Sequence, residues 1–145
     1  MPKKHTHKLK KLQIEDVGIH LLARVKVNGV MANMVIDTGA SRTVFDLEKM
    51  KAFDLDIEKT DYLSSGIGTN SLESVITVIE KFQIGRLKIK DFPVVLIDLQ
   101  HVNTSYEMLK LPPVIGIIGG DLLNTYNANI NYNTSKIIFT INAEQ

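Results

Sequence analysis

The sequence of 145 residues contains no cysteine. A disulfide framework, a thiolate metal site and a cysteine nucleophile are therefore excluded. The chain also lacks an apolar run of the roughly 20 residues that a membrane-spanning helix needs. The apolar stretch behind the basic start is interrupted by Gln13, Glu15 and Asp16, which argues against a signal peptide. We therefore expect a soluble, cytoplasmic protein with no membrane partner.

Histidines are few and scattered, and only His5 and His7 lie close together in the sequence. A pair spaced two residues apart in a lysine-rich segment could meet a metal ion, but no carboxylate accompanies it. We interpret these imidazoles as solvated side chains, and we expect neither a metal site nor a cofactor.

Charge is distributed unevenly along the chain. The first eleven residues contain five lysines and no acidic residue, whereas residues 12–145 carry 12 basic and 16 acidic side chains. This segment has no interleaved aromatic residues, so a solvated tail is favoured over a nucleic-acid contact. We predict a basic, disordered tail over residues 1–14. A single domain is predicted over residues 15–145, since a chain of this length with 44% hydrophobic residues suits one core.

One carboxylate stands out because of its position. The residues of Val17–Val27 alternate loosely between apolar and polar, Asn28-Gly29 is a dipeptide typical of tight hairpin turns, and an apolar strand returns from Val30 into Asp37. A carboxylate at the end of a buried strand is costly unless it is used. The structural alternative is an aspartate that caps a turn through its side chain.

The rest of the chain alternates short apolar strands with turns. Strands are predicted at Thr43–Phe45, Lys81–Ile89, Phe92–Leu99, Val114–Ile118, Ala128–Tyr132 and Lys136–Ile141, with a turn or bulge near Gly85-Arg86. Helices are predicted after a cap at Asp46, over Asn103–Leu111 before Pro112-Pro113, and after Gly119-Gly120 with Asp121 as the cap.

A further hairpin is predicted between residues 61 and 79. Its arms, Asp61–Ser65 and Ser74–Ile79, flank a tip that begins with Gly66, Ile67 and Gly68. Glycines and an isolated apolar residue suit a mobile hairpin that covers a ligand. An ordinary hairpin loop is the alternative.

Two segments together resemble a known family. Val35-Ile36-Asp37-Thr38-Gly39-Ala40-Ser41 resembles the catalytic turn of aspartic proteases, and Gly116-Ile117-Ile118-Gly119-Gly120-Asp121-Leu122-Leu123 resembles their second signature. Because each segment occurs once, the chain is similar to the retropepsin-like, retroviral-type group. The resemblance implies an all-β acid-protease half-barrel with a flap hairpin and short helices.

The same resemblance implies an aspartic endopeptidase that acts as a homodimer on a peptide or protein substrate. Each subunit contributes one aspartate, which activates a water molecule without a metal or cofactor. The implied catalytic residues are Asp37, Thr38 and Gly39. The implied substrate-binding residues are Gly39, Ala40, Ser41, Gly66, Ile67 and Gly68. A noncatalytic peptide- or protein-binding module of the same fold is the alternative.

The chain departs from retroviral proteases at two places. Many of them carry an acidic residue and an arginine that form an ion pair bracing the dimer, where this chain has Ser41 and Gly120. A replacement pair between Arg42 and Asp121 is one interpretation, and a solvated arginine beside a helix cap is the other. The chain also ends in its own hairpin, so the terminal strands of two copies need not interleave.

Overall fold

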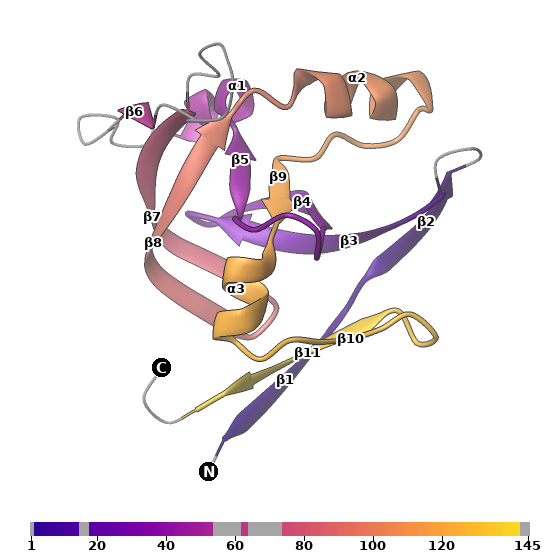
Figure 1. Cartoon of the computed structure of the whole chain (residues 1–145), viewed down its shortest axis with the longest axis vertical. Coiled ribbons are helices and arrows are strands. Elements are labelled where there is room, and N and C mark those ends of the chain that lie inside the picture. Colours follow the sequence, from indigo (N-terminus) through magenta and orange to yellow (C-terminus); the bar gives the residue numbers. More distant parts are fainter. Residues whose placement is uncertain (1, 15–17, 54–61, 64–73, 143–145) are drawn as a thin grey trace.

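The computed structural model describes residues 2–14, 18–53, 62–63 and 74–142. Most of these residues lie in strands, and six strands close into a barrel (Figure 1). Around the barrel the strands follow the order β3 (Gly18–Val27), β4 (Val30–Ile36), β9 (Gly116–Ile118), β5 (Val44–Asp46), β8 (Leu87–Ile97) and β7 (Ser74–Ile84), which pairs again with β3. The predicted all-β half-barrel is confirmed.

The β3–β4 hairpin forms as the sequence predicts. Asn28 and Gly29 both have positive φ angles, of 47° and 85°, and Val27 pairs with Val30 across the turn. Two positive φ angles are typical of the tight turns that match the twist of hairpin strands. The hairpin therefore fixes the register of β4 and the position at which β4 ends.

β9 lies between two strands that follow one another in the sequence. It runs parallel to β4, with Ile36 opposite Ile118, and antiparallel to β5, with Val44 opposite Ile117. A Cβ atom on Gly116 would overlap the Val44 carbonyl oxygen, so only glycine fits at the start of β9. The loop that joins β4 to β5 must consequently pass around the end of β9.

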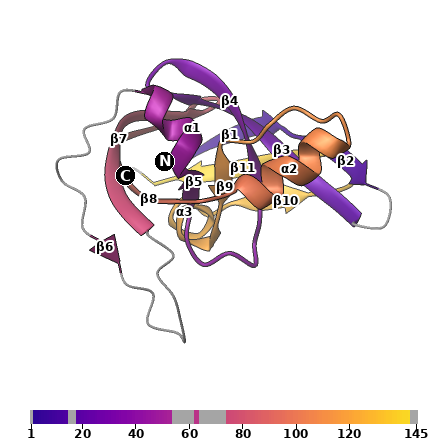
Figure 2. The same cartoon turned by 90° about the horizontal axis from the view of Figure 1, so that it is seen from above.

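The arms of the predicted hairpin pair in the structure. β6 (Tyr62–Leu63) is antiparallel to the start of β7, with Leu63 opposite Ser74. β6 and the purple loop that follows β4 project on the same side of the molecule (Figure 2). The predicted tip, with Gly66, Ile67 and Gly68, lies outside the described residues.

The strands after this hairpin differ from the prediction. A break was expected between Ile89 and Phe92, but β8 is continuous and the turn lies at Gly85-Arg86. Asp91 has a φ of 50°, and the pairing skips it between Ile79–Phe92 and Lys81–Lys90. The polar residues that suggested a break therefore lie within one strand, where the pairing omits Glu80 and Asp91 and continues in the same register.

Short helices connect the strands. They are α1 (Leu47–Met50), followed by a 3-10 turn at Lys51–Phe53, α2 (Gln100–Met108) and α3 (Gly120–Thr125). Asp46 does not cap α1 through its side chain; it is buried and accepts a hydrogen bond from the Leu99 backbone N–H at 3.0 Å. In the described part of the chain, every helix is too short or too polar to cross a membrane.

The predicted disordered tail is wrong. β1 (Lys3–Lys8) pairs with β11 (Lys136–Ile141), and β11 pairs with β10 (Asn129–Asn131), while β2 (Lys10–Ile14) pairs with β3. Leu9, between β1 and β2, is buried. The lysines point outward from an ordered sheet whose apolar side chains come from β11, a strand far away in the sequence.

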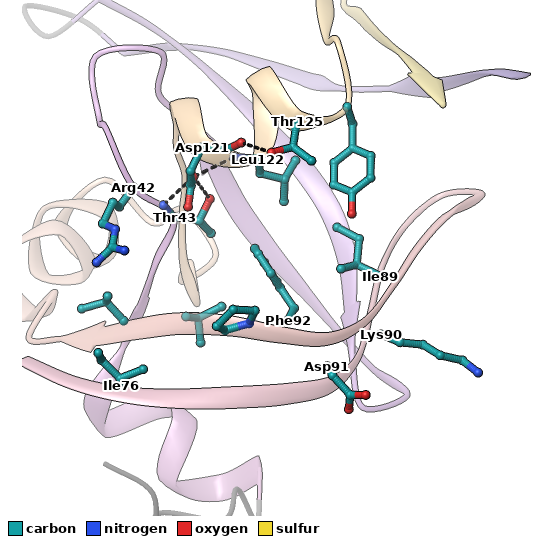
Figure 3. Close-up of a pocket in the computed structure, with 14 residues that line it drawn as sticks. Arg42, Thr43, Ile76, Ile89, Lys90, Asp91, Phe92, Asp121, Leu122 and Thr125 are labelled. Atoms are coloured by element: carbon teal, nitrogen blue, oxygen red, sulfur yellow. Dashed lines mark hydrogen bonds between the residues drawn. The ribbon is translucent and has the colours of Figure 1, made fainter. Parts of the chain in front are cut away.

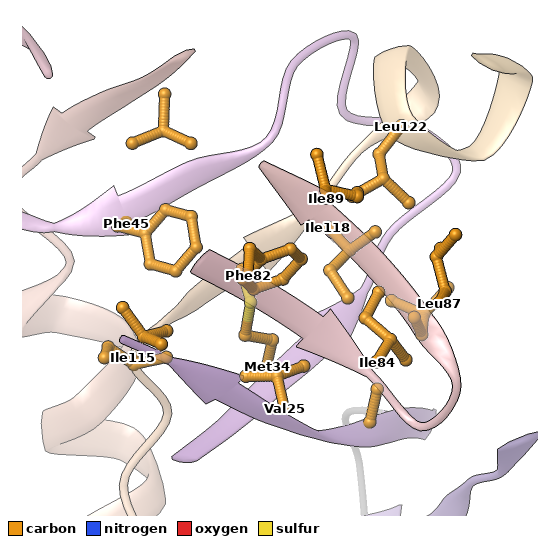
Figure 4. Packing of buried hydrophobic residues seen from close by; sticks show 14 of the residues in the cluster. Val25, Met34, Phe45, Phe82, Ile84, Leu87, Ile89, Ile115, Ile118 and Leu122 are labelled. Carbon is orange, nitrogen blue, oxygen red and sulfur yellow. The ribbon is translucent and has the colours of Figure 1, made fainter. Parts of the chain in front are cut away.

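The barrel is filled by one apolar cluster (Figure 4). Phe45 and Phe82 meet edge to face, with ring centroids 5.8 Å apart, and Met34 and Ile118 are fully buried beside them. Close-packed interiors resist deformation. The packed core thus restrains the ends of β4, β5 and β9, and these ends fix the two anchor points of the loop that joins β4 to β5.

Candidate functional site

Asp37 begins the loop at the end of β4. Its N–H donates to the Ile118 carbonyl at 3.0 Å, which continues the β4–β9 pairing by one residue. Its carbonyl accepts from the Ala40 N–H at 3.1 Å, and its carboxylate Oδ1 accepts from the Gly39 N–H at 2.9 Å. The carboxylate is therefore oriented by its own turn, and the side chain is exposed.

The second half of the loop is attached to α3. The carbonyls of Ala40 and Ser41 accept hydrogen bonds from the N–H groups of Gly120 and Asp121, at 2.7 and 3.2 Å. These two hydrogen bonds hold the loop against the start of α3. Within the described residues, the carbonyl of Gly39 and the N–H of Ser41 have no hydrogen-bond partner. One acceptor and one donor next to Asp37 thus stay available.

Thr43 connects the loop to the second signature. Its hydroxyl accepts a hydrogen bond from the Gly119 N–H at 3.1 Å and donates to Asp121 Oδ1 at 2.7 Å. The same carboxylate oxygen accepts from the backbone N–H groups of Thr43 and Leu122, both at 2.8 Å. Oδ1 of Asp121 thus accepts three hydrogen bonds from backbone and hydroxyl donors of the same chain.

The suggested pair between Arg42 and Asp121 is not present. Among the residues that the structure describes, the ion pair found is Lys51 with Glu48, at 3.0 Å. Asp121 binds Thr43 instead, and Arg42 extends from the loop toward β7 and β8 (Figure 3).

The glycine of the second signature is required by close contact. A Cβ atom on Gly119 would lie 2.5 Å from the carbonyl carbon and oxygen of Arg42 and 2.9 Å from the Ala40 carbonyl oxygen. Real Cβ atoms do not approach backbone atoms so closely. Gly119 therefore lets the end of β9 lie directly against the loop that carries Asp37.

Asp37 and Thr38 face a cavity of about 350 Å³. Its wall includes His20 on β3, Ile130 on β10, and Tyr132 just beyond that strand. None of these three side chains was predicted as a site residue, because they lie far from Asp37 in the sequence. Within the described residues that line this cavity, Asp37 is the single carboxylate.

His20 is held in place by α2. Its Nδ1 lies 2.6 Å from the hydroxyl of Tyr106, and the two rings stack with centroids 5.8 Å apart. Tyr106 is buried, and desolvation raises its pKa. The sequence indicated only that Tyr106 belongs to a helical segment; nothing in its spacing pointed to His20.

A second and larger cavity lies beside the other end of the same loop, at Arg42 and Thr43 (Figure 3). It measures about 510 Å³ and is bounded by Arg42, by Phe92 and Val94 of β8, and by Leu122 and Tyr126 near α3. Desolvation raises the pKa of Tyr126. Asp37 does not line this cavity, so cavity size alone does not identify the reactive group.

The predicted site residues are thus only partly brought together. Asp37 and Thr38 face one cavity, while Ala40 and Ser41 bind α3 through their carbonyls. No group of three His, Asp or Glu side chains in the described ranges lies close enough to hold a metal ion. The carboxylate that faces this cavity among the described residues is the exposed, oriented one of Asp37.

Comparison with protein families gives a match to the aspartyl protease model over residues 23–122, which include the Asp37 loop, β9 and most of the barrel. The chain belongs to the aspartyl protease family. No curated protein matches its sequence.

Solved structures of retropepsin-like proteases share the fold. A retropepsin-like aspartic protease from Rickettsia conorii is 17% identical, with a TM-score of 0.61, over 97% of this chain and 96% of that one. EIAV protease, crystallised with the inhibitor HBY-793, is 19% identical, with a TM-score of 0.53, over 81% and 98%. The retroviral protease-like domain of Ddi1 from Leishmania major is 16% identical, with a TM-score of 0.52, over 79% and 82%. The fold of this member of the aspartyl protease family is retropepsin-like.

Proposed function

We propose that this aspartyl protease is an endopeptidase that acts as a homodimer, with one Asp37 from each subunit in a single active site. The observation that carries the proposal is the exposed Asp37 carboxylate, which is oriented by the Gly39 N–H at the mouth of a cavity. Peptide hydrolysis by this chemistry needs two carboxylates, and one chain supplies one.

The mechanism follows from the proximity of two like charges. Two carboxylates a few ångströms apart cannot both ionise cheaply, so the pair shares one proton. The ionised carboxylate takes a proton from a bound water molecule as the water oxygen attacks the peptide carbonyl carbon. The protonated carboxylate donates its proton to the carbonyl oxygen. The amine then leaves with the proton of one carboxylate as the C–N bond breaks, and the other carboxylate takes a proton from a hydroxyl of the tetrahedral intermediate. The pair thus holds one proton again.

Substrate binding uses the free backbone groups beside the carboxylate. The Gly39 carbonyl and the Ser41 N–H can pair with an extended peptide as an added strand, because neither group has a partner within the described residues. Thr38 faces the cavity next to Asp37, where its hydroxyl can bind the opposing loop. Gly66, Ile67 and Gly68 would cover the peptide as a flap from each subunit.

The test is an Asp37→Asn variant assayed with a peptide library from acidic to neutral pH. Asparagine keeps the size and one oxygen of the side chain but cannot exchange the proton, so cleavage is expected to disappear. Thermal unfolding should change little, because Asp37 is exposed. Asp98→Asn is a matched control, since Asp98 also accepts a hydrogen bond from a backbone N–H two residues ahead.

Cleavage that survives in Asp37→Asn contradicts the catalytic role. A wild-type protein that binds peptides but cleaves none across the pH range would instead support the binding module. Mixing wild-type with Asp37→Asn subunits adds a sharper readout: activity should fall as mixed dimers form, because each mixed site has one ionisable carboxylate.

A further inference from the structure

We propose that the second copy docks on the free edge of β10, so that the two terminal sheets join into one antiparallel sheet across a two-fold axis at Ile130. The inference rests on the proposed function, because only a second copy completes the Asp37 site. It adds the surface through which the two copies meet.

The outer strands of the described sheets differ in charge. β1 is the edge on one side of the terminal sheet and carries Lys3, Lys4 and Lys8, and β2 is an edge of the larger sheet and carries Lys10 and Lys11. Lysines on edge strands oppose pairing with another chain. β10 is the other edge of the terminal sheet, and residues 126–135 contain no charged side chain. The β10 strand itself therefore adds no like charge to a contact between two copies, although the Lys11 ammonium donates to the Tyr132 carbonyl at 2.8 Å beyond the end of the strand and Lys136 of β11 is paired with Asn131.

The sequence around β10 reads nearly the same in both directions. Asparagines stand at positions 127, 129, 131 and 133, and small or apolar residues stand between them, with Ile130 at the centre. A two-fold contact brings the same surface of each copy together, so residue i meets residue j and j meets i. Antiparallel pairing centred on Ile130 would place Asn129 opposite Asn131 of the second copy.

The position of β10 links this edge to the active site. Ile130 and Tyr132 line the same cavity as Asp37, so a contact centred on Ile130 would lie beside the cavity that the carboxylate faces. Tyr132 is 56% exposed, and Ile19 on the wall of the same cavity is 49% exposed. A second copy at this edge would cover both side chains and bring its own cavity alongside.

β11 cannot take the role of the docking edge. It is paired on one side with β1 and on the other with β10, over the whole length of β10. Within one subunit, the backbone hydrogen-bonding groups on both sides of β11 are therefore paired with β1 and β10. β10 remains as the uncharged edge next to Asp37.

Engineered disulfides test the register directly, because the native chain has no cysteine to interfere. Asn129→Cys and Asn131→Cys are prepared as separate variants at exposed positions, mixed, and oxidised. Residues directly opposite in antiparallel strands lie within disulfide range, whereas diagonal neighbours are about 7–8 Å apart and too distant. The mixture should form a linked heterodimer, and each variant alone should stay largely unlinked.

Gln13→Cys is the matched control, since it is exposed on the lysine-bearing edge of β2. It should remain unlinked alone and in mixtures with either β10 variant. If the 129–131 mixture links no better than the Gln13→Cys control, the proposed interface is wrong.

A charge variant tests the same edge without crosslinking. Asn129→Lys/Asn131→Lys places two lysine pairs opposite each other across the axis, and light scattering should show a dimer dissociation constant raised about tenfold. Gln13→Lys/Gln100→Lys adds the same charge at exposed positions away from β10 and should leave the constant unchanged. An unchanged constant in the β10 variant overturns the proposal.

The two proposals can fail separately. A linked 129–131 dimer that cleaves no peptide would keep the β10 interface and reject the peptidase. Cleavage that depends on Asp37, together with absent 129–131 linkage, would keep the peptidase and reject the interface.

Discussion

Thr43 donates two hydrogen bonds to one oxygen of Asp121, from its backbone N–H at 2.8 Å and from its hydroxyl at 2.7 Å. The two residues are 78 positions apart in the sequence. This contact holds the loop after Asp37 against α3. It supplies, within one subunit, a brace between the two signature segments of the chain.

Replacing Thr43 by valine tests this brace. Valine keeps the shape of the side chain but leaves Asp121 and the Gly119 N–H each with one partner fewer, in a site where Thr43 is buried. The free energy of unfolding should fall by about 2 kcal/mol, measured by denaturant titration. Thr43→Ser keeps the hydroxyl and should lose clearly less. Equal losses in the two variants would contradict the prediction, because the variant that keeps the hydroxyl would then be no more stable than the one that lacks it.

The two glycines of the second signature should respond differently to alanine. Gly119→Ala forces a Cβ atom against the backbone of Arg42, and about 1–3 kcal/mol of stability should be lost, together with peptidase activity. At Gly120 the nearest atom, the Ala40 carbonyl oxygen, would be 3.5 Å away, an ordinary contact. Gly120→Ala starts a helix and should leave stability unchanged or slightly higher. Thermal unfolding of the pair checks the contrast, which a similar loss in both variants would contradict.

Tyr106→Phe removes the hydroxyl that holds His20 and should lower the free energy of unfolding by about 1 kcal/mol at neutral pH. Burial raises the pKa of Tyr106, so the folded protein favours the protonated phenol. That contribution is present below the unfolded pKa of about 10 and is lost as pH rises through the folded pKa. Unfolding curves between pH 9 and 11 should fall less steeply for Tyr106→Phe than for the wild type. Parallel curves would assign the alkaline loss to other groups.

His7 should destabilise the fold in acid. Desolvation lowers its pKa against a smaller opposing effect of a hydrogen bond with the Arg24 backbone, and its Nε2 is buried without a partner. Below about pH 6.5 the unfolded chain takes up a proton first, so stability falls as pH falls toward the folded pKa. His7→Phe should flatten the dependence measured between pH 7.5 and 5. The exposed His101→Gln variant should follow the wild type; a wild-type slope in His7→Phe would refute the prediction.

Local patterns sufficed for the parts of the site built from neighbouring residues. Asn28-Gly29 predicted the hairpin that ends at Asp37, and Gly39 predicted the turn that orients it. The apolar strand before Gly119 was likewise found, because buried strands are short apolar runs. These features depend on backbone geometry that particular residue types require.

Other parts depended on partners that local patterns do not reveal. The lysine-rich start resembled a solvated tail, yet β1 pairs with β11 from the opposite end of the chain. His20 and Tyr106 meet only after α2 folds over β3. The engagement of Asp121 by Thr43 was missed for the same reason, since the choice among donors is made by tertiary packing.

The placement of β9 between β4 and β5 also determines the order in which the contacts of the Asp37 loop can form during folding. The Gly119 N–H donates a hydrogen bond to the hydroxyl of Thr43, which lies 76 positions away in the sequence. The Asp37 N–H likewise donates to the carbonyl of Ile118, a residue close to the opposite end of the chain. Contacts between distant positions form late and slow folding. The loop that carries Asp37 can therefore be anchored to β9 and α3 only after the chain has been synthesised as far as α3. The hydrogen bond between the Gly39 N–H and the Asp37 carboxylate is local, so this turn can form before the loop is anchored to the barrel.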